Sequence, residues 1–237
     1  MNILAIDTAT NFLSLAISHE NKINSFLGNV GNSHSEQIIS EINNLFSSVQ
    51  LNKKDLSLII YNKGPGSFTG LRIGLSVAIG IATGLNIPLV AISSFEIYAH
   101  QIYKDIVFDE YEIFILIDAR LNQLYIAKIN INMDYILEPL LVDIDYLLKN
   151  RDLFINPDKK NIITGNALII YPQLEELLND NCLNFSKHQL DKYPSAINLI
   201  EIYKQRKCSL LSTSNVELLY LRDKVALNLL EQKQLKF

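Results

Sequence analysis

A short segment near the start of the chain recurs about halfway along it. Residues 6–16 and 117–127 share five identities in eleven positions at a constant offset of 111. In both copies an Ile-Asp pair, Ile6-Asp7 or Ile117-Asp118, ends an apolar run. A repeat that opens with a strand, an aspartate and a hairpin predicts a duplicated module rather than one continuous domain. We therefore expect two lobes, residues 1–110 and 111–237.

The first half of the chain alternates between strand-like and helix-like periods. Strands are predicted at 3–6, 12–18, 23–30, 56–61 and 89–92, and helices at 35–49, 67–83 and 94–103. Ser33 and Glu36 have the spacing of a capping box before the first of these helices. The order βββαβαβα is typical of an α/β lobe with a mixed sheet. The second half is less regular, with strands expected at 111–117, 123–131, 135–142, 162–164 and 218–221, and helices at 144–149, 171–178 and 196–206.

Composition excludes several classes of protein. The 237 residues are 49% hydrophobic and 19% charged, which predicts a globular chain with a sizeable core. A formal net charge of −4 argues against autonomous, salt-driven binding of nucleic acid. Two cysteines are too few for a disulfide framework and no export signal is visible, so we expect a cytoplasmic protein.

One apolar run is long enough to cross a bilayer. Residues 73–95 contain no charged side chain. Gly84, Asn86 and Pro88 form a helix-stop pattern inside this run. The run therefore predicts a buried helix followed by a buried strand, and no membrane association.

The two repeated aspartates are candidates for a nucleotide site. If they face each other across a cleft, Asp7 and Asp118 could hold Mg²⁺ or its waters, while Thr8 and Thr10 face phosphate oxygens. An aspartate after a strand also commonly forms an Asx turn with no ligand at all. Both interpretations stay open at this point.

The segment Gly64 to Gly74 is the most unusual stretch of the sequence. It lacks the lysine of a Walker loop and the flanking glycines of a nucleophile elbow. Ser67 is a candidate N-cap for the helix that follows. Along that helix small residues recur every four positions and predict a ridge that another helix can approach closely: Gly70, Gly74, Ala78 and Ala82. Spacing does not decide whether that partner belongs to the same chain. The four histidines lack the spacing of a helical metal site, so we expect no metal there.

Several of these segments together resemble the bacterial TsaB (YeaZ) family of tRNA threonylcarbamoyladenosine biosynthesis proteins. The resemblance runs through nearly the full length and is carried by residues 3–10, 34–36, 64–74, 117–120 and 219–222. It implies a two-lobed actin-like (ASKHA) fold, α/β with mixed sheets. It also implies a noncatalytic partner of the paralogous TsaD-type enzyme, which transfers a threonylcarbamoyl group to the adenosine beside the anticodon in tRNAs reading codons that begin with A.

The resemblance extends to partners and surfaces. It implies that the helices at 35–49 and 67–83 pack against the paralogue, that a TsaE-type ATPase joins the assembly, and that tRNA is met through the complex. A homodimer is the alternative state of the free chain. The expected interface residues are His34, Gly70, Gly74, Ala78 and Ala82, and no cofactor of its own is expected, with ATP and Mg²⁺ supplied through partners or held weakly at Asp7 and Asp118. The competing hypothesis is an independent actin-like ATPase or kinase that uses those two aspartates.

Overall fold

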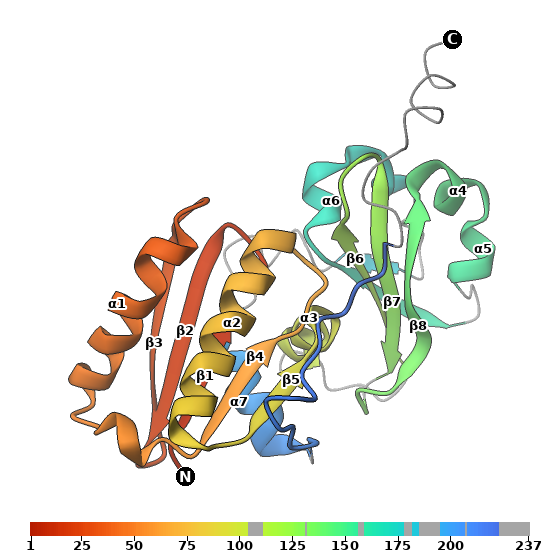
Figure 1. Cartoon of the computed structure of the whole chain (residues 1–237). Coiled ribbons are helices and arrows are strands. Elements are labelled where there is room, and N and C mark those ends of the chain that lie inside the picture. Colours follow the sequence, from red (N-terminus) through yellow and green to blue (C-terminus); the bar gives the residue numbers. More distant parts are fainter. Residues whose placement is uncertain are drawn as a thin grey trace.

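The computed structural model describes residues 1–103, 111–130, 132–155, 159–177, 182–184, 195–206 and 208–222. Two five-stranded mixed sheets organise the chain, one in each half (Figure 1). Their strand orders are β3-β2-β1-β4-β5 and β8-β7-β6-β9-β10, which are the same order in the two repeats. The sequence repeat thus corresponds to a repeated topology.

The first sheet is built from strands that match their predicted positions to within two residues. These are β1 (Ile3–Asp7), β2 (Phe12–His19), β3 (Lys22–Asn29), β4 (Leu58–Asn62) and β5 (Leu89–Ile92). β1, β2 and β3 form antiparallel pairs, whereas β1, β4 and β5 run parallel. The parallel strands bring their carboxyl ends to one edge of the sheet, where Asp7 and Asn62 lie.

Two long helices cover one face of the first sheet. They are α1 (His34–Ser48) and α2 (Phe68–Leu85), and a 3-10 turn, η1 (Lys53–Asp55), leads into β4. The Ser67 hydroxyl accepts a hydrogen bond of 3.2 Å from the Gly70 amide, which confirms the predicted N-cap. The capping box predicted at Ser33 is wrong, because Ser33 precedes α1 but its side chain accepts no cap hydrogen bond. α2 ends at Asn86, which adopts the left-handed conformation with φ 53°.

The second sheet is accompanied by shorter helices and is less closely predicted. It contains β6 (Tyr111–Asp118), β7 (Gln123–Asn130), β8 (Tyr135–Asp143), β9 (Lys160–Thr164) and β10 (Cys182–Asn184), with α4 (Ile144–Lys149), α5 (Arg151–Phe154), α6 (Ala167–Ile170) and η2 (Pro172–Leu177). Instead of one helix at 171–178, the chain forms α6 and then a 3-10 segment that starts at Pro172. β10 was not predicted, and the strand predicted at 218–221 is wrong because those residues form no regular secondary structure.

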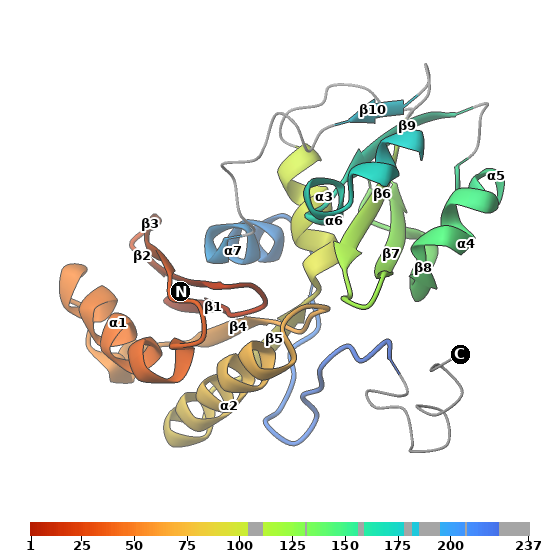
Figure 2. The same cartoon turned by 90° about the horizontal axis from the view of Figure 1, so that it is seen from above.

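Two helices lie between the sheets and are exchanged between the halves (Figure 2). α3 (Ser94–Tyr103) packs on β6 and β7, and α7 (Ala196–Gln205) packs on β1, β2 and β4. Apolar side chains of α7 such as Leu199 and Ile200 share a buried cluster with Ile3 and Ala5. The core of the first lobe is therefore completed by a helix from the far end of the chain.

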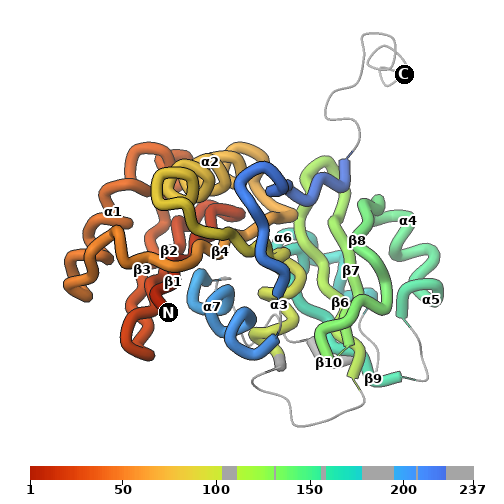
Figure 3. Tube along the Cα trace, turned by 60° about the horizontal axis from the view of Figure 1, so that its bottom comes forward, coloured from red at the N-terminus to blue at the C-terminus, as the bar shows by residue number. Residues whose placement is uncertain are grey.

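Residues 208–222, here called the C-terminal strap, run back along the first sheet and reach the second (Figure 3). Leu211 forms an isolated antiparallel bridge with Leu89, and the Tyr61 hydroxyl donates to the Glu217 carbonyl at 3.0 Å. At its far end Arg222 donates to the Ala119 carbonyl at 2.8 Å, in the β6–β7 hairpin. The strap thereby joins the two lobes by hydrogen bonds at both ends.

α2 is the one helix, among the described residues, that is long and apolar enough to cross a membrane by length and composition. It packs against β4 and β1, and Gly70, Gly74, Ala78 and Ala82 are buried. The same measures of length and composition are met by helices in the core of soluble proteins.

Candidate functional site

The repeated aspartates do not occupy equivalent places. On β1, Asp7 shares its face with Ile3 and Ala5, which pack against α7 between the sheets. On β6, Asp118 shares its face with Phe114 and Leu116, which pack against the outer helices of the second sheet. A shift of one residue in a strand turns a side chain to the opposite face. The two aspartates therefore lie on different kinds of face, one toward the space between the sheets and one toward the outer helices, although the two sheets are related by the repeat.

Asp7 is buried at the end of β1, with only 2% of its surface exposed. Its Oδ1 accepts a hydrogen bond of 2.9 Å from the Ala9 amide, as in an Asx turn. Among the described residues, neither the Oδ2 of Asp7 nor the Nδ2 of Asn62 has a hydrogen-bond partner. Burial raises the pKa of Asp7 from 3.8 to about 6, while the Ala9 amide and the Asn62 side chain lower it. Asp7 is thus a buried acid rather than an open ligand.

Asp118 is held by neighbours in the second lobe. Its Oδ1 accepts from the Arg120 amide and from the Tyr171 hydroxyl, both at 2.8 Å, and its Oδ2 lies 3.4 Å from the Arg120 guanidinium. These contacts use both carboxylate oxygens. The arrangement of Asp7 and Asp118 therefore does not fit the joint coordination of a Mg²⁺–nucleotide.

The other residues predicted at or near this cleft also have structural contacts. Thr8 is buried against α2, and the Thr10 hydroxyl accepts from the Phe12 amide at 3.1 Å. His34 is buried at the start of α1, where its Nε2 lies 3.3 Å from the Phe12 carbonyl oxygen. Thr8 and His34 thus join the β1–β2 hairpin to α2 and α1, and Thr10 stabilises the turn of the hairpin.

The ridge of small residues on α2 faces its own sheet. Gly70, Gly74, Ala78 and Ala82 are all buried. A Cβ atom at Gly70 would overlap the Thr8 carbonyl oxygen, and one at Gly74 would overlap the Thr8 hydroxyl. The ridge therefore allows α2 to approach β1 closely, and it is not available to another protein while α2 is folded.

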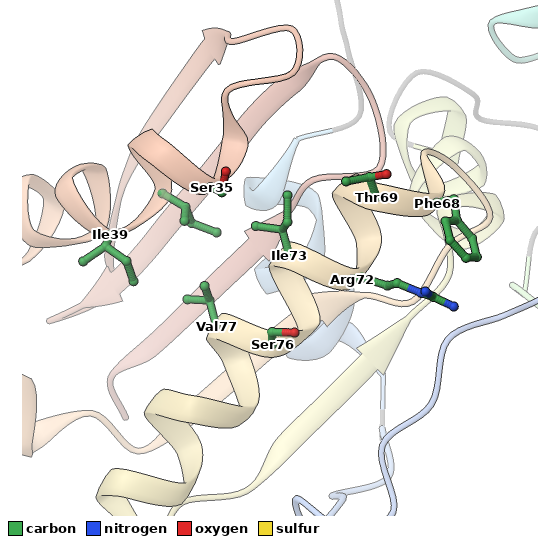
Figure 4. A pocket seen from close by; sticks show the side chains of 9 residues that line it. Ser35, Ile39, Phe68, Thr69, Arg72, Ile73, Ser76 and Val77 are labelled. Atoms are coloured by element: carbon green, nitrogen blue, oxygen red, sulfur yellow. The ribbon is translucent and has the colours of Figure 1, made fainter.

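The opposite side of α2 borders a shallow groove on the molecular surface (Figure 4). The groove has a volume of about 430 Å³ and lies between α1 and α2. Figure 4 shows Ile39 of α1 and Ile73 and Val77 of α2 pointing into the space between the helices. Ile39 is 51% exposed. The groove is an apolar surface with no cover within the described part of the chain.

Sequence reasoning missed the cluster at the end of this groove. The Arg72 guanidinium lies over the Phe68 ring, 3.7 Å from its centroid, and its Nε donates to the Tyr220 hydroxyl at 3.1 Å. Phe68 and Arg72 are four residues apart on α2, a spacing that indicates contact. Tyr220 comes from the strap, and no local pattern pointed to its position.

Comparisons with known proteins agree with this architecture. The TsaD family, described as tRNA N6-adenosine threonylcarbamoyltransferase, matches residues 28–162. The tRNA threonylcarbamoyladenosine biosynthesis protein TsaB of Escherichia coli is 30% identical over 128 residues, a match that spans 54% of this chain and 54% of that protein. TsaB of Buchnera aphidicola subsp. Schizaphis graminum is 27% identical over 202 residues, covering 84% of this chain and 90% of the relative.

Solved structures give the same result for the fold. YeaZ from Pseudomonas aeruginosa superposes with a TM-score of 0.73 at 20% identity, covering 93% of this chain and 99% of that one. A second structure from Pseudomonas aeruginosa, described by its similarity to the peptidase YEAZ, has a TM-score of 0.75 and the same coverage. Together with the TsaD match and the two mixed sheets, these likenesses confirm the two-lobed actin-like (ASKHA) α/β fold.

Proposed function

The chain belongs to the TsaB/YeaZ family, and from this premise we propose that it is a noncatalytic subunit of a tRNA-modifying assembly. Its partner would be a TsaD-type transferase, which adds threonylcarbamoyl to the adenosine beside the anticodon in tRNAs reading codons that begin with A. A TsaE-type ATPase and tRNA would bind to that complex, and the assembly would lie in the cytoplasm. A homodimer is the alternative state of the free chain.

The single observation that carries this proposal is the apolar groove between α1 and α2. Exposed Ile39, together with Ile73 and Val77, offers aliphatic surface to a helix of another protein. The first 110 residues also hold only 15 charged side chains, against 31 in the rest of the chain. Depletion of charge is typical of the centre of a protein interface. The docking surface is thus assigned to the groove side of α2, in place of the buried ridge.

The contacts of the two aspartates support a noncatalytic role. Asp7 is buried, and Asp118 is occupied by Arg120 and Tyr171. A carboxylate that binds a metal-nucleotide must present free oxygen to it. The competing hypothesis of an independent ATPase or kinase would require Asp7 to become accessible and Asp118 to leave its present contacts.

Size-exclusion chromatography with light scattering tests the proposal. The chain is mixed with the TsaD-type protein of the same organism, and a heterodimer is expected. Ile39→Asp, which places a charge in the groove, should abolish the heterodimer. Leu153→Asp is the matched control, because Leu153 is 73% exposed on α5 in the second lobe. If the wild-type chain forms no complex, or if Ile39→Asp binds as well as Leu153→Asp does, the groove is not the docking surface.

An ATPase assay separates the competing hypothesis. Purified wild-type chain should turn over no more ATP than an Asp7→Asn variant does. Sustained turnover by wild type that Asp7→Asn removes would show a catalytic protein and contradict the noncatalytic proposal.

A further inference from the structure

Arg72 occupies a defined position at the edge of the groove. Its guanidinium is stacked on the Phe68 ring and lies 5.8 Å from the centroid of the Tyr220 ring. The two rings are themselves 6.0 Å apart with an interplanar angle of 51°. The Tyr220 hydroxyl accepts from Nε, which fixes the orientation of the guanidinium plane. An arginine held in this way loses less side-chain entropy when it binds a further group.

Among the residues that the structure describes, none neutralises the charge of Arg72. Within the described ranges, no carboxylate oxygen lies within 4.0 Å of its guanidinium nitrogens. Arg206 and Arg120 differ in this respect, since Arg206 pairs with Glu96 at 2.9 Å and Arg120 with Asp118 at 3.4 Å. Arg72 is exposed, and only its Nε has a hydrogen-bond partner in the described chain. The remaining NH groups form a fork suited to a carboxylate.

Two residues of the strap make this geometry depend on the second lobe. Tyr220 holds Arg72, and two positions later Arg222 donates to the Ala119 carbonyl and to Gln123 Oε1 at 2.8 and 2.7 Å. On the other side of Tyr220, the strap is bound to the first lobe, because the Leu219 amide donates to the Lys63 carbonyl at 2.7 Å. The position of Tyr220 over α2 is therefore set from both sides.

We propose that Arg72, presented by Phe68 and Tyr220, is an anchor that binds an aspartate or glutamate of an amphipathic helix seated in the α1–α2 groove. The inference rests on the proposed function and deepens it by stating the chemistry of the partner: apolar side chains against Ile39 and Val77, and one acidic side chain at the end near Phe68. It also makes the C-terminal strap part of the docking surface.

A protein carboxylate fits this surface better than a nucleic acid does. Among the described residues that line the groove, Arg72 is the one with a charged side chain, and its neighbours there are aliphatic Ile73 and Val77 and the hydroxyl-bearing Thr69 and Ser76. A phosphate backbone is bound by several cations in series. Here, among the described residues that line the groove, one guanidinium without a carboxylate partner borders an apolar surface, which is the charge pattern that a helix with one acidic residue complements.

The test uses the full-length chain and the TsaD-type protein of the same organism, with the dissociation constant measured by titration calorimetry at two NaCl concentrations. Arg72→Gln should weaken binding tenfold or more, because a charge-assisted contact is lost. Tyr220→Phe keeps the ring but removes the hydrogen-bond acceptor, so a smaller loss of a few fold is expected. Arg151→Gln is the matched control, because Arg151 is half-exposed on α5. Thermal melts of all variants check that folding is unchanged.

Salt dependence distinguishes a charge contact from a packing role. Binding of wild type should weaken as NaCl rises, and binding of Arg72→Gln should respond less steeply. If Ile39→Asp abolishes binding while Arg72→Gln and Arg151→Gln have the same dissociation constant, the proposed role of Arg72 is wrong and the groove remains the docking surface. If wild type does not bind the partner, both proposals fail. If Arg72→Gln keeps partner affinity but loses affinity for tRNA, the guanidinium serves nucleic acid and the carboxylate assignment is overturned.

Discussion

The Nε of Arg72 donates to the Tyr220 hydroxyl at 3.1 Å, across 148 positions of sequence. Arg72 belongs to the second turn of α2, and Tyr220 belongs to the strap that ends at the β6–β7 hairpin. The orientation of this α2 side chain therefore depends on a segment that is hydrogen-bonded to the second lobe. The groove and the strap consequently form one continuous surface.

Substitutions on α2 should separate its buried ridge from its exposed side. Gly74→Ala should destabilise the protein by about 1–3 kcal/mol, because the new methyl group would overlap the Thr8 hydroxyl. The free energy of unfolding in urea measures the effect. Gly80→Ala is the control: apart from the adjoining residues and backbone of α2 itself, no atom of the described chain lies within 4 Å of the place its methyl group would take, so the gain in helix propensity should stabilise by up to ~1 kcal/mol. Equal effects of the two changes would contradict the close approach of α2 to β1.

Asp7 should make stability fall as pH rises. Because the folded-state pKa of about 6 lies above the ordinary value of 3.8, the folded protein binds a proton more tightly than the unfolded chain does. Its contribution is fully present below about pH 4 and is lost as pH rises through 6, by on the order of 2–3 kcal/mol. Asp7→Asn should remove this part of the pH dependence, measured by urea unfolding at pH 4, 6 and 8. Parallel curves for wild type and Asp7→Asn would show that the Asp7 pKa is not raised.

The C-terminal end of α2 should respond to the residue in the left-handed position. Asn86 has φ 53° and ends the helix, with the Ile87 amide donating to the Ala82 carbonyl. Glycine adopts this conformation without strain, so Asn86→Gly should raise the melting temperature slightly. Asn86→Ala should instead cost about 1 kcal/mol. The reverse order of the two melting temperatures would contradict the cap.

Loss of Arg222 should loosen the strap. The guanidinium makes two hydrogen bonds to the β6–β7 hairpin, and such charged contacts contribute about 1.5–3 kcal/mol. In Arg222→Ala the Leu219 amide should exchange with solvent roughly tenfold faster or more, as followed by hydrogen–deuterium exchange. Arg151→Ala should leave that amide unchanged. Unaltered protection in Arg222→Ala would mean that Lys63 and Tyr61 hold the strap by themselves.

Local patterns predicted the elements well where the chain is periodic. The strands of the first sheet and the cap of α2 at Ser67 follow from alternation and side-chain chemistry that act within a few residues. The C-terminal end of α2 was also foreseen, although Asn86 rather than Gly84 takes the left-handed position. In the second half, Pro172 divides the expected helix, because proline has no amide hydrogen to donate.

The faces of the elements were harder to predict than their positions. An offset of 111 aligned Asp7 with Asp118. Asp7, however, lies on the face of the first sheet that packs against α7 between the sheets, and Asp118 lies on the face of the second sheet that packs against its outer helices. Short identities do not resolve a shift of one residue. The ridge at Gly70 and Gly74 was recognised as a close-packing surface, and spacing had no means of telling whether a sheet or a partner lies against it. The strap was missed as a structural unit because its contacts come from residues more than a hundred positions away.

The exchange of α7 has a consequence for synthesis of the chain. The Ala196 amide donates to the Ser14 hydroxyl at 2.8 Å, across 182 positions. At about 5–20 residues per second, a ribosome needs roughly 10–40 s to make the intervening chain. Throughout that interval the side of β1 that carries Ile3 and Ala5 lacks α7 to cover it, so the nascent first lobe offers an apolar sheet face to chaperones until α7 has been made.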